Sequence, residues 1–403
     1  MRIILVSNYF PPETVGAGIW VHQLACDLRD RGHQVTVLTG FPSYPQGKVF
    51  AGYRGGVFRR EEIDGIQVIR TYTYATPSKR FWPRFLSFGS FCASSLIGGL
   101  AARQRADVVY AILPPLPLGI SAWAMARAAG ARLVVNVQDI YPDIAVAMGF
   151  LRNRRAIAFF RRMERWIYRA ADRVVVVSDG FRRNLESKGV PANKIAVVPN
   201  WADPRAIRPG PRENSFRREL GINGEFVVLY SGGLSHNSHL DPVLEAARRL
   251  KGDGILFLIA GEGVHKARLE RQARESGLAS VRFLPFQPLE RYPEMLAAAD
   301  ATLVTLHPAA ACASLPSKIY KQMAAARPIV ALAPPESDLA RLVETGRCGW
   351  SVPCNQPEAL ARVLRQAARD RQDCARRGAN GRAYLERECS RSFCVAAIEQ
   401  TLS

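Results

Sequence analysis

Residues 108–139 read VVYAILPPLPLGISAWAMARAAGARLVVNVQD. An apolar run, VVYAIL, leads through a proline-rich loop into a helix that we predict over Gly119–Ala129, and a second apolar run, LVVNVQD, follows. Val108–Ala126 carries no charge and is long enough to cross a bilayer, but its prolines break it into a strand, a loop and a helix start. Two uninterrupted apolar strands that flank a helix are typical of a parallel sheet covered on both faces.

The same alternation extends in both directions along the chain. Further apolar strands are predicted at 3–8, 35–40, 174–179 and 195–200, and then, after a polar stretch, at 226–232, 255–263, 281–286, 301–306, 328–333 and 350–353. Because 403 residues exceed one ordinary core, we predict two doubly wound α/β domains, residues 1–200 and 204–383, with a helix over 384–403 that completes the first. The domains are expected to face each other across a cleft lined by the carboxyl ends of the strands.

The chain is strongly basic, with 55 Lys and Arg against 35 Asp and Glu and a formal charge of +20. This surplus indicates an anionic partner (nucleic acid, anionic lipid or a phosphorylated substrate), although a generally arginine-rich composition would also produce it. No basic-aromatic sheet motif or recognition helix stands out, so nucleic acid is not the expected partner. The eight cysteines form no C-x-x-C pair, which favours reduced thiols in a cytosolic setting and predicts no metal site.

Two strand ends in the first half carry candidate ligand-binding residues. Gly16 and Gly18 lie at a helix start, where the backbone can approach a ligand and free N–H groups attract phosphate; alternatively, they only turn the chain. Gln138, Asp139 and Asp143 follow another apolar strand. A carboxylate there could orient or deprotonate an acceptor hydroxyl, or it could cap a helix.

The second half has glycine-rich turns at two strand ends, with a histidine just beyond the first: Gly232, Gly233, Gly261 and His236. The segment SLPSKIYKQMAAARPIV, residues 314–330, is more informative because it places Ser317 at a helix start with Lys318 beside it. Backbone N–H groups, a hydroxyl and a cation brought together in this way suit a diphosphate. A plain helix cap beside a solvated lysine is the alternative.

Seven segments occur in order along nearly the whole chain: NYFPPETVGAG (8–18), DRGHQVTVLT (30–39), VQDIYPD (137–143), VVPNWAD (197–203), YSGGL (230–234), AGEG (260–263) and PSKIYKQMAAARPIV (316–330). This set resembles family 4 glycosyltransferases, which are retaining enzymes of the GT-B fold with two Rossmann-like domains. It is most similar to the branch found with O-antigen, capsule and colanic-acid synthesis, the fucosamine-transferase type.

The resemblance implies roles for individual residues. Asp139 would lie near the reacting sugar, Phe286 near the donor base, and Lys318 at the diphosphate. The residues expected to bind the donor are Gly16, Gly18, Gly232, Gly233, His236, Gly261, Phe286, Ser317, Lys318, Ile319 and Lys321, and those expected to act in catalysis are Gln138, Asp139 and Lys318. No cofactor or metal is expected beyond the substrate nucleotide-sugar, for which a UDP-linked donor is favoured, because cationic groups and helix N-termini would stabilise the leaving nucleoside diphosphate.

This chain departs from the family pattern at several positions. The usual glutamate pair falls on Ala313 and Lys321, and a lysine cannot accept the hydrogen bonds of ribose or sugar hydroxyls. The Arg and Lys that often follow the glycine turn correspond to His236 and Asn237. Gln138 replaces a common histidine, and Ala326 a frequent glycine.

A basic, aromatic segment lies in the first half. Residues 65–106 contain no acid, and basic and aromatic residues alternate from position 79: Lys79, Arg80, Phe81, Trp82, Arg84 and Phe85. A second arginine-rich run spans residues 152–183. Such segments suit an anionic bilayer surface, although a solvated helix face with core aromatics would look alike. We predict peripheral attachment at the cytoplasmic face of the inner membrane.

The expected function follows from the resemblance. It is transfer of a sugar, with retention and without a metal, from a nucleoside-diphosphate sugar (UDP-linked favoured) to a polyprenyl-diphosphate-linked saccharide in bacterial surface polysaccharide synthesis. Two alternatives remain open: a degenerate, non-catalytic scaffold of an assembly complex, favoured by the missing glutamates, and a sugar-nucleotide epimerase of the same fold.

Overall fold

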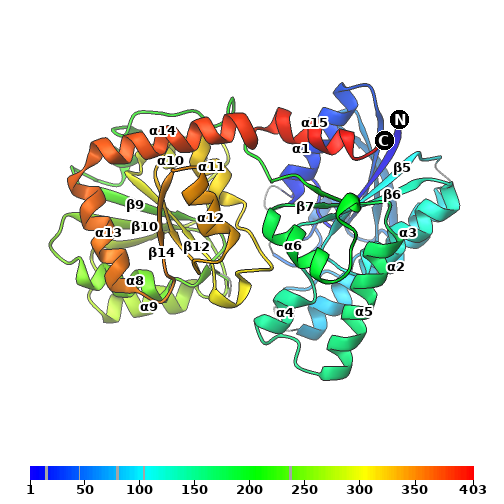
Figure 1. Ribbon diagram of the computed structural model, residues 1–403, viewed down its shortest axis with the longest axis horizontal. Helices are drawn as coiled ribbons and strands as arrows, with labels where there is room; N and C mark the ends of the chain where they lie inside the picture. The colour runs from blue at the N-terminus through cyan, green and yellow to red at the C-terminus, as the bar shows by residue number, and fades with distance from the viewer. Residues whose placement is uncertain (14–16, 45, 79–80, 103–104, 236–237) are drawn as a thin grey trace. The chain divides into compact units, whose positions relative to one another are not determined.

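A computed structural model describes residues 1–403 except 14–16, 45, 79–80, 103–104 and 236–237, and it does not describe the side chain of Phe81 (Figure 1). The chain divides into two compact units. The first comprises Met1–Val198 with Val395–Ser403, and the second comprises Pro199–Cys394.

The sheet of the first unit has the strand order β3-β4-β2-β1-β5-β6-β7-β8. Its strands are β1 (Arg2–Ser7), β2 (Gln34–Gly40), β3 (Phe58–Ile63), β4 (Ile66–Thr71), β5 (Val108–Leu113), β6 (Arg132–Val137), β7 (Arg173–Val176) and β8 (Ile195–Val197). Neighbouring strands pair in parallel, except that β3 pairs antiparallel with β4. The order reverses between β1 and β5, and ligands of such sheets bind beside the strand ends at this switch point.

Helices alternate with these strands as the sequence predicts. They are α1 (Ala17–Asp30), η1 (Ala51–Tyr53), α2 (Phe81–Ala101), α3 (Leu118–Ala129), α4 (Asp143–Ala147), α5 (Arg154–Ala170), α6 (Asp179–Ser187) and η2 (Ala192–Lys194). The uncharged segment from Val108 divides into β5 and α3, with the prolines between them. Within the described ranges, we find no helix that combines the length and apolarity needed to cross a bilayer.

The second unit has a fully parallel sheet with the strand order β11-β10-β9-β12-β13-β14. Its strands are β9 (Phe226–Ser231), β10 (Ile255–Ala260), β11 (Val281–Leu284), β12 (Ala301–Thr305), β13 (Ile329–Leu332) and β14 (Gly349–Val352). Its helices are α7 (Ser215–Glu219), α8 (Asp241–Arg249), α9 (Lys266–Glu275), α10 (Tyr292–Ala298), η4 (Pro308–Ala310), α11 (Lys318–Ala324), α12 (Asp338–Thr345), α13 (Pro357–Arg369) and α14 (Arg371–Glu388). The switch point lies between β9 and β12.

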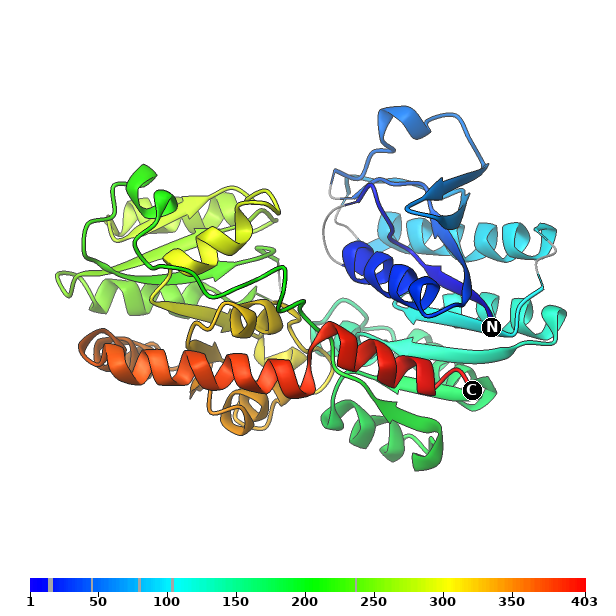
Figure 2. The same cartoon turned by 90° about the horizontal axis from the view of Figure 1, so that it is seen from above.

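Both faces of this second sheet are covered, which explains why its strands are apolar without alternation. Phe226, Val228 and Tyr230 point to one face, where they pack with residues of α8, α9 and α13. On the other side α11 contacts β12 and β13, and α14 packs on α11 along the outside of the unit (Figure 2).

The single helix expected over 384–403 is instead two helices, α14 and α15 (Arg391–Gln400). The break falls at Cys389 and Ser390. Ser390 forms a β-bridge with Ala202, and its hydroxyl accepts a hydrogen bond from the Phe393 N–H at 3.4 Å, which makes it the cap of α15.

Candidate functional site

The turns that follow β9 and β10 pack backbone against backbone. The Gly232 N–H donates to the Ala260 carbonyl at 2.9 Å, and the Leu234 N–H donates to the Glu262 carbonyl at 2.9 Å. A Cβ at Gly261 would overlap the Gly232 carbonyl oxygen. The glycines therefore let two strand ends meet closely and leave backbone uncovered by side chains at the edge of the sheet.

Lys318, the first residue of α11, lies against this turn. Its Nζ is 3.8 Å from the centroid of the Tyr230 ring, a cation–π contact. A Cβ at Gly232 would lie only 2.7 Å from the same Nζ. Because β9 and β12 are neighbours, the helix that follows β12 brings Lys318 to the end of β9, at the switch point of the sheet.

The ammonium group of Lys318 has no carboxylate partner among the residues that the structure describes. The side chain is half-buried, and this burial lowers the pKa of Lys318 to about 7. A cation held without a counterion in a desolvated place is poised to bind an anion.

Lys321 lies one turn further along α11. Its Nζ is 5.2 Å from the centroid of the Tyr292 ring, and the Tyr292 hydroxyl lies 2.9 Å from Ser231 Oγ at the end of β9. Burial lowers the pKa of Lys321 as well. The sequence identified Lys321 as a candidate. It did not reveal that the rings of Tyr230 and Tyr292 contact Lys318 and Lys321.

The other residues predicted to bind the sugar donor differ in their exposure and position. Ser317 is exposed just before α11, and Phe286 is 37% exposed just after β11, at the same edge of the sheet. Gly233 has open space around its α-carbon. Ile319 requires a correction, because its side chain is fully buried and its N–H donates to the Pro316 carbonyl, so it has no free group for a ligand. Gly16 and His236 fall outside the described residues.

In the first unit, Gln138 and Asp139 follow β6. The Gln138 amide donates to Asn136 Oδ1 at 2.6 Å, and Asn136 in turn donates to the Tyr110 hydroxyl at 2.7 Å, so this side chain is oriented from within the sheet. Asp139 is half-buried. It lies close enough to Tyr141 to add to the effect of burial, which raises the pKa of that phenol to about 12.

Asp143, the third candidate of this strand end, belongs to the packing of the unit. Its carboxylate lies 2.7 Å from Lys188 Nζ, and the same ammonium contacts the buried Glu164 at 2.6 Å. Burial raises the pKa of Glu164 to about 7. The Asp143 carboxylate is thus ion-paired with Lys188, a partner that sequence spacing could not identify.

The loop after β1 is shaped by a residue whose role the sequence did not reveal. The buried Glu13 carboxylate accepts hydrogen bonds from the N–H groups of Phe10, Ser43 and Tyr44. A Cβ at Gly18 would lie 2.9 Å from the Glu13 carbonyl oxygen, so the glycine allows α1 to close on this loop. The only sequence signal for this role was the position of Glu13 directly after Pro11 and Pro12.

The basic, aromatic segment is partly described. Lys79 and Arg80 lie outside the described residues, as does the side chain of Phe81. Trp82 is 69% exposed, and Arg84 and Phe85 are also exposed. Arg70, which belongs to the same acid-free stretch, is completely buried and pairs with Glu61, so it supports the fold and cannot touch a surface.

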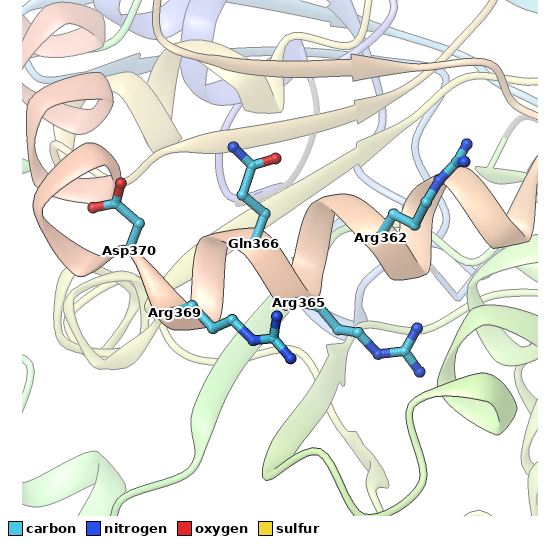
Figure 3. Close-up of a pocket in the computed structure, with 5 residues that line it drawn as sticks. All are labelled: Arg362, Arg365, Gln366, Arg369 and Asp370. Carbon is cyan, nitrogen blue, oxygen red and sulfur yellow. The ribbon is translucent and has the colours of Figure 1, made fainter.

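A surface hollow of about 500 Å³ lies along α13 (Figure 3). It is lined by Arg362, Arg365, Gln366, Arg369 and Asp370. Figure 3 shows Arg365 and Arg369 extending to the same side of the helix, and Arg365 pairs with Asp253 at 2.7 Å. None of the donor candidates that the structure describes lines this hollow.

Two Rossmann-like units in one chain are the architecture of the GT-B fold. Solved structures agree with this fold. HepE of Anabaena in complex with UDP aligns with a TM-score of 0.75 at 19% identity, over 100% of this chain and 99% of that one. WaaG, a glycosyltransferase involved in lipopolysaccharide biosynthesis, aligns with a TM-score of 0.70 at 16% identity, over 99% of each chain.

The sequence comparisons identify the family. Residues 15–201 match the glycosyl transferase 4-like domain, and residues 212–384 match the glycosyl transferases group 1 domain. The putative colanic acid biosynthesis glycosyl transferase WcaI of Escherichia coli is 30% identical, over 91% of this chain and 92% of its own length. The probable glycosyltransferase WbjE of Pseudomonas aeruginosa is 30% identical over 65% of this chain and 66% of its own length. The chain therefore belongs to this glycosyltransferase family, as the ordered motifs predicted.

Proposed function

We propose that this glycosyltransferase moves a sugar from a nucleoside-diphosphate sugar to a lipid-linked saccharide during the synthesis of a bacterial surface polysaccharide. The observation that carries the proposal is the Lys318 ammonium, which has no carboxylate partner among the described residues and lies on the Tyr230 ring beside the glycine turn of β9. Colanic acid synthesis in the name of one relative supports the pathway class, and UDP in the HepE structure supports a UDP-linked donor.

The chemistry proposed for Lys318 is stabilisation of the leaving group. When the bond between the sugar and the diphosphate breaks, negative charge develops on the departing phosphate oxygen. A preorganised cation at the diphosphate lowers the energy of that charge more than it lowers the energy of the bound donor. It would therefore raise turnover. The side chains at this turn supply the charge without a metal in the proposed scheme.

Asp139 is proposed to orient the acceptor hydroxyl, with Gln138 held beside it by the amide chain to Asn136. Retention, which the family resemblance implies, requires attack on the face that the leaving group vacates. The acceptor proton then passes to the departing phosphate oxygen, so that the products are the new glycoside and the nucleoside diphosphate.

We also propose that the first unit attaches to an anionic membrane through an aromatic–arginine surface. We define this surface as the exposed residues Trp82 and Phe85 of α2 together with Phe159, Phe160 and the six arginines of α5. The rings are continuous: Trp82 contacts Phe85 at 5.9 Å between centroids, and Phe85 contacts Phe160 at 6.4 Å. Phe159, which is 60% exposed, extends the row.

The arginines of α5 face outward beside these rings. None of them forms an ion pair with any residue in the described part of the chain, whereas Glu164, Ile167 and Tyr168 bury the opposite face of the helix. A helix with unpaired arginines and adjacent exposed aromatics suits the headgroup region of an anionic bilayer. Attachment there would place the first unit beside an acceptor that is anchored in lipid.

The proposed activity is tested by incubating the protein with UDP- and GDP-sugars and a polyprenyl-diphosphate-linked monosaccharide. We expect release of the nucleoside diphosphate together with a longer lipid-linked product whose new linkage keeps the anomeric configuration of the donor. Binding of the nucleoside diphosphate without any product would support a non-catalytic scaffold, a reading favoured by Ala313 and Lys321 at the usual glutamate positions. Conversion of the donor sugar without an acceptor would support an epimerase.

A further inference from the structure

One ammonium group, that of Lys188, joins three helices of the first unit. Its Nζ lies 2.7 Å from the Asp143 carboxylate and 2.6 Å from the Glu164 carboxylate. Asp143 begins α4, Glu164 belongs to α5, and Lys188 directly follows α6. We call these three residues the Lys188 cluster. A single cation thus ties α4 to both α5 and α6.

The Lys188 cluster is largely shielded from water. The side chain of Glu164 is 1% exposed and that of Lys188 is 17% exposed. The Asn184 amide donates to the Asp143 carboxylate at 3.3 Å, and the buried Tyr168 hydroxyl faces Glu164. Because little water screens these charges, they attract each other more strongly than exposed charges would.

The cluster is connected to the strand end that presents Gln138 and Asp139. The Gln138 N–H donates to the Leu113 carbonyl of β5 at 2.9 Å, which fixes the start of this segment to the sheet. Ile140 is fully buried, and its carbonyl accepts a hydrogen bond from the Ile144 N–H of α4 at 3.0 Å. Asp139 therefore lies between the sheet and α4, so that a displacement of α4 would also move its carboxylate.

Stability alone does not explain three charged residues at this place. Burying an ion pair costs desolvation that offsets much of its attraction, and apolar residues of similar volume often stabilise a fold equally well. Apolar contacts, however, are non-directional, whereas charge-assisted hydrogen bonds fix a distance and a direction. The cluster therefore suits a place where a nearby side chain has to be held accurately.

We infer that Lys188 is a positioning residue for the transfer reaction: it holds α4 against α5 and α6, and thereby keeps Asp139 where it can orient the acceptor hydroxyl. This inference rests on the proposed function and adds a residue to its acceptor side. Lys188 acts through Asp143 and does not itself touch the substrates. Its loss should therefore impair use of the acceptor and leave use of the donor, which is bound by the second unit, largely unchanged.

The test is steady-state kinetics of the full chain with the UDP- or GDP-sugar that gives product and a polyprenyl-diphosphate-linked monosaccharide as acceptor. Lys188→Met should lower kcat/KM for the acceptor by about tenfold to a hundredfold, because a small misplacement of an orienting group is costly. The KM for the donor should change by less than about threefold. Lys188→Arg keeps the charge and should retain kcat/KM for the acceptor within about threefold of the wild type.

Asp143→Asn is a milder variant that cuts only the link to α4. It keeps the pair of Lys188 and Glu164, so that no buried charge is left without a partner. It should show the same selective loss for the acceptor, and it replaces Lys188→Met in the comparison if that protein folds poorly.

Lys194→Met is the matched control. The Lys194 ammonium donates to the carbonyls of Arg169 and Ala171 at the end of α5, each at 2.9 Å, so its loss loosens α5 without cutting the link to α4. This variant should leave kcat/KM for the acceptor near the wild-type value. An equal loss in the control would overturn the positioning role of Lys188.

The outcomes separate this inference from the proposed function. If the wild type forms no product with any of the donors, both are wrong. If the wild type is active and Asp143→Asn and Lys188→Met use the acceptor as well as it does, the proposed function survives and only the positioning role is rejected. A loss shared equally by donor and acceptor would indicate a general effect on the fold and would reject that role too.

Discussion

The Lys318 ammonium occupies the space that a side chain at Gly232 would need. A Cβ on that glycine would lie 2.7 Å from Nζ and 3.0 Å from Cε of the lysine. Gly232 also has a φ of +143°, a conformation that other residues rarely adopt. The lysine and the glycine thus depend on each other, although they are far apart in the sequence.

Gly232→Ala is therefore expected to displace Lys318 and weaken the binding of nucleoside diphosphate by about tenfold or more, the cost of losing one charge-assisted contact. Calorimetric titration with UDP and GDP measures the loss. Gly233→Ala serves as the stability control, because a Cβ there meets nothing within 4 Å, and it should melt close to the wild type. A Gly232→Ala protein that binds like the wild type would show that the lysine is not held by this turn.

Binding should also take up protons. Burial lowers the pKa of Lys318 from 10.5 to about 7, so the free lysine is largely neutral at about pH 8.5. A bound diphosphate favours the ammonium form and raises this pKa. Lys318 then takes up as much as about one proton from the solvent on binding, and affinity falls as the pH rises from about 7 toward 10.

Titrations at about pH 8.5 in two buffers with different ionisation enthalpies measure this uptake. Lys318→Arg stays charged at that pH and should therefore bind the nucleotide with a smaller proton uptake than the wild type. Equal proton uptake by the arginine variant and the wild type would contradict the assignment.

Ala326 is expected to be a site where glycine stabilises the protein. It has a φ of +53°, whereas the neighbouring Ala325 has a φ of −78°. Ala326→Gly should raise the free energy of unfolding of the second unit by about 0.5–1 kcal/mol, because it relieves a left-handed alanine. Ala325→Gly should lower it by a similar amount. Denaturant titration of both variants tests the pair, and the same sign for both would be inconsistent with this explanation.

The aromatic–arginine surface is tested by sedimentation with anionic liposomes. Arg155→Glu/Arg162→Glu should reduce the bound fraction strongly, because each basic residue near an anionic surface contributes about 1 kcal/mol. Arg362→Glu/Arg369→Glu on α13 changes the net charge by the same amount at exposed residues of the other unit, and it should leave binding nearly unchanged. Equal losses in the two double variants would mean that net charge, and not this surface, governs attachment.

Much of the fold could be predicted because parallel sheets leave a strong signal in the sequence. Strands covered on both faces, such as β5 and β9, are largely apolar, and their carboxyl ends are marked by Pro114 after β5 and Gly232 after β9. The hairpin of β3 and β4 was not predicted. β3 lies at the edge of the sheet, and its sequence, FRREEI, is largely polar and exposed.

The site was predictable to the extent that it lies at strand ends. Gly232 directly follows β9 and Lys318 begins the helix after β12, so both candidates could be placed at the same edge of the sheet, and their role in binding stays a prediction. The ion pairs of Asp143 with Lys188 and of Arg70 with Glu61 were not predicted, since tertiary pairing is not encoded in local spacing. Ile319 was misjudged because adjacency to Lys318 says nothing about which face of α11 a side chain occupies.

Thermal melting of the wild type and Lys318→Met in the presence of UDP and GDP tests the central claim most directly, since a ligand that binds only the folded state raises the melting temperature. We predict that the melting temperature of the wild type rises with the concentration of at least one of the two nucleotides, and that Lys318→Met shows little or no rise at the same concentrations. An equal rise in the variant would contradict the claim that Lys318 holds the diphosphate.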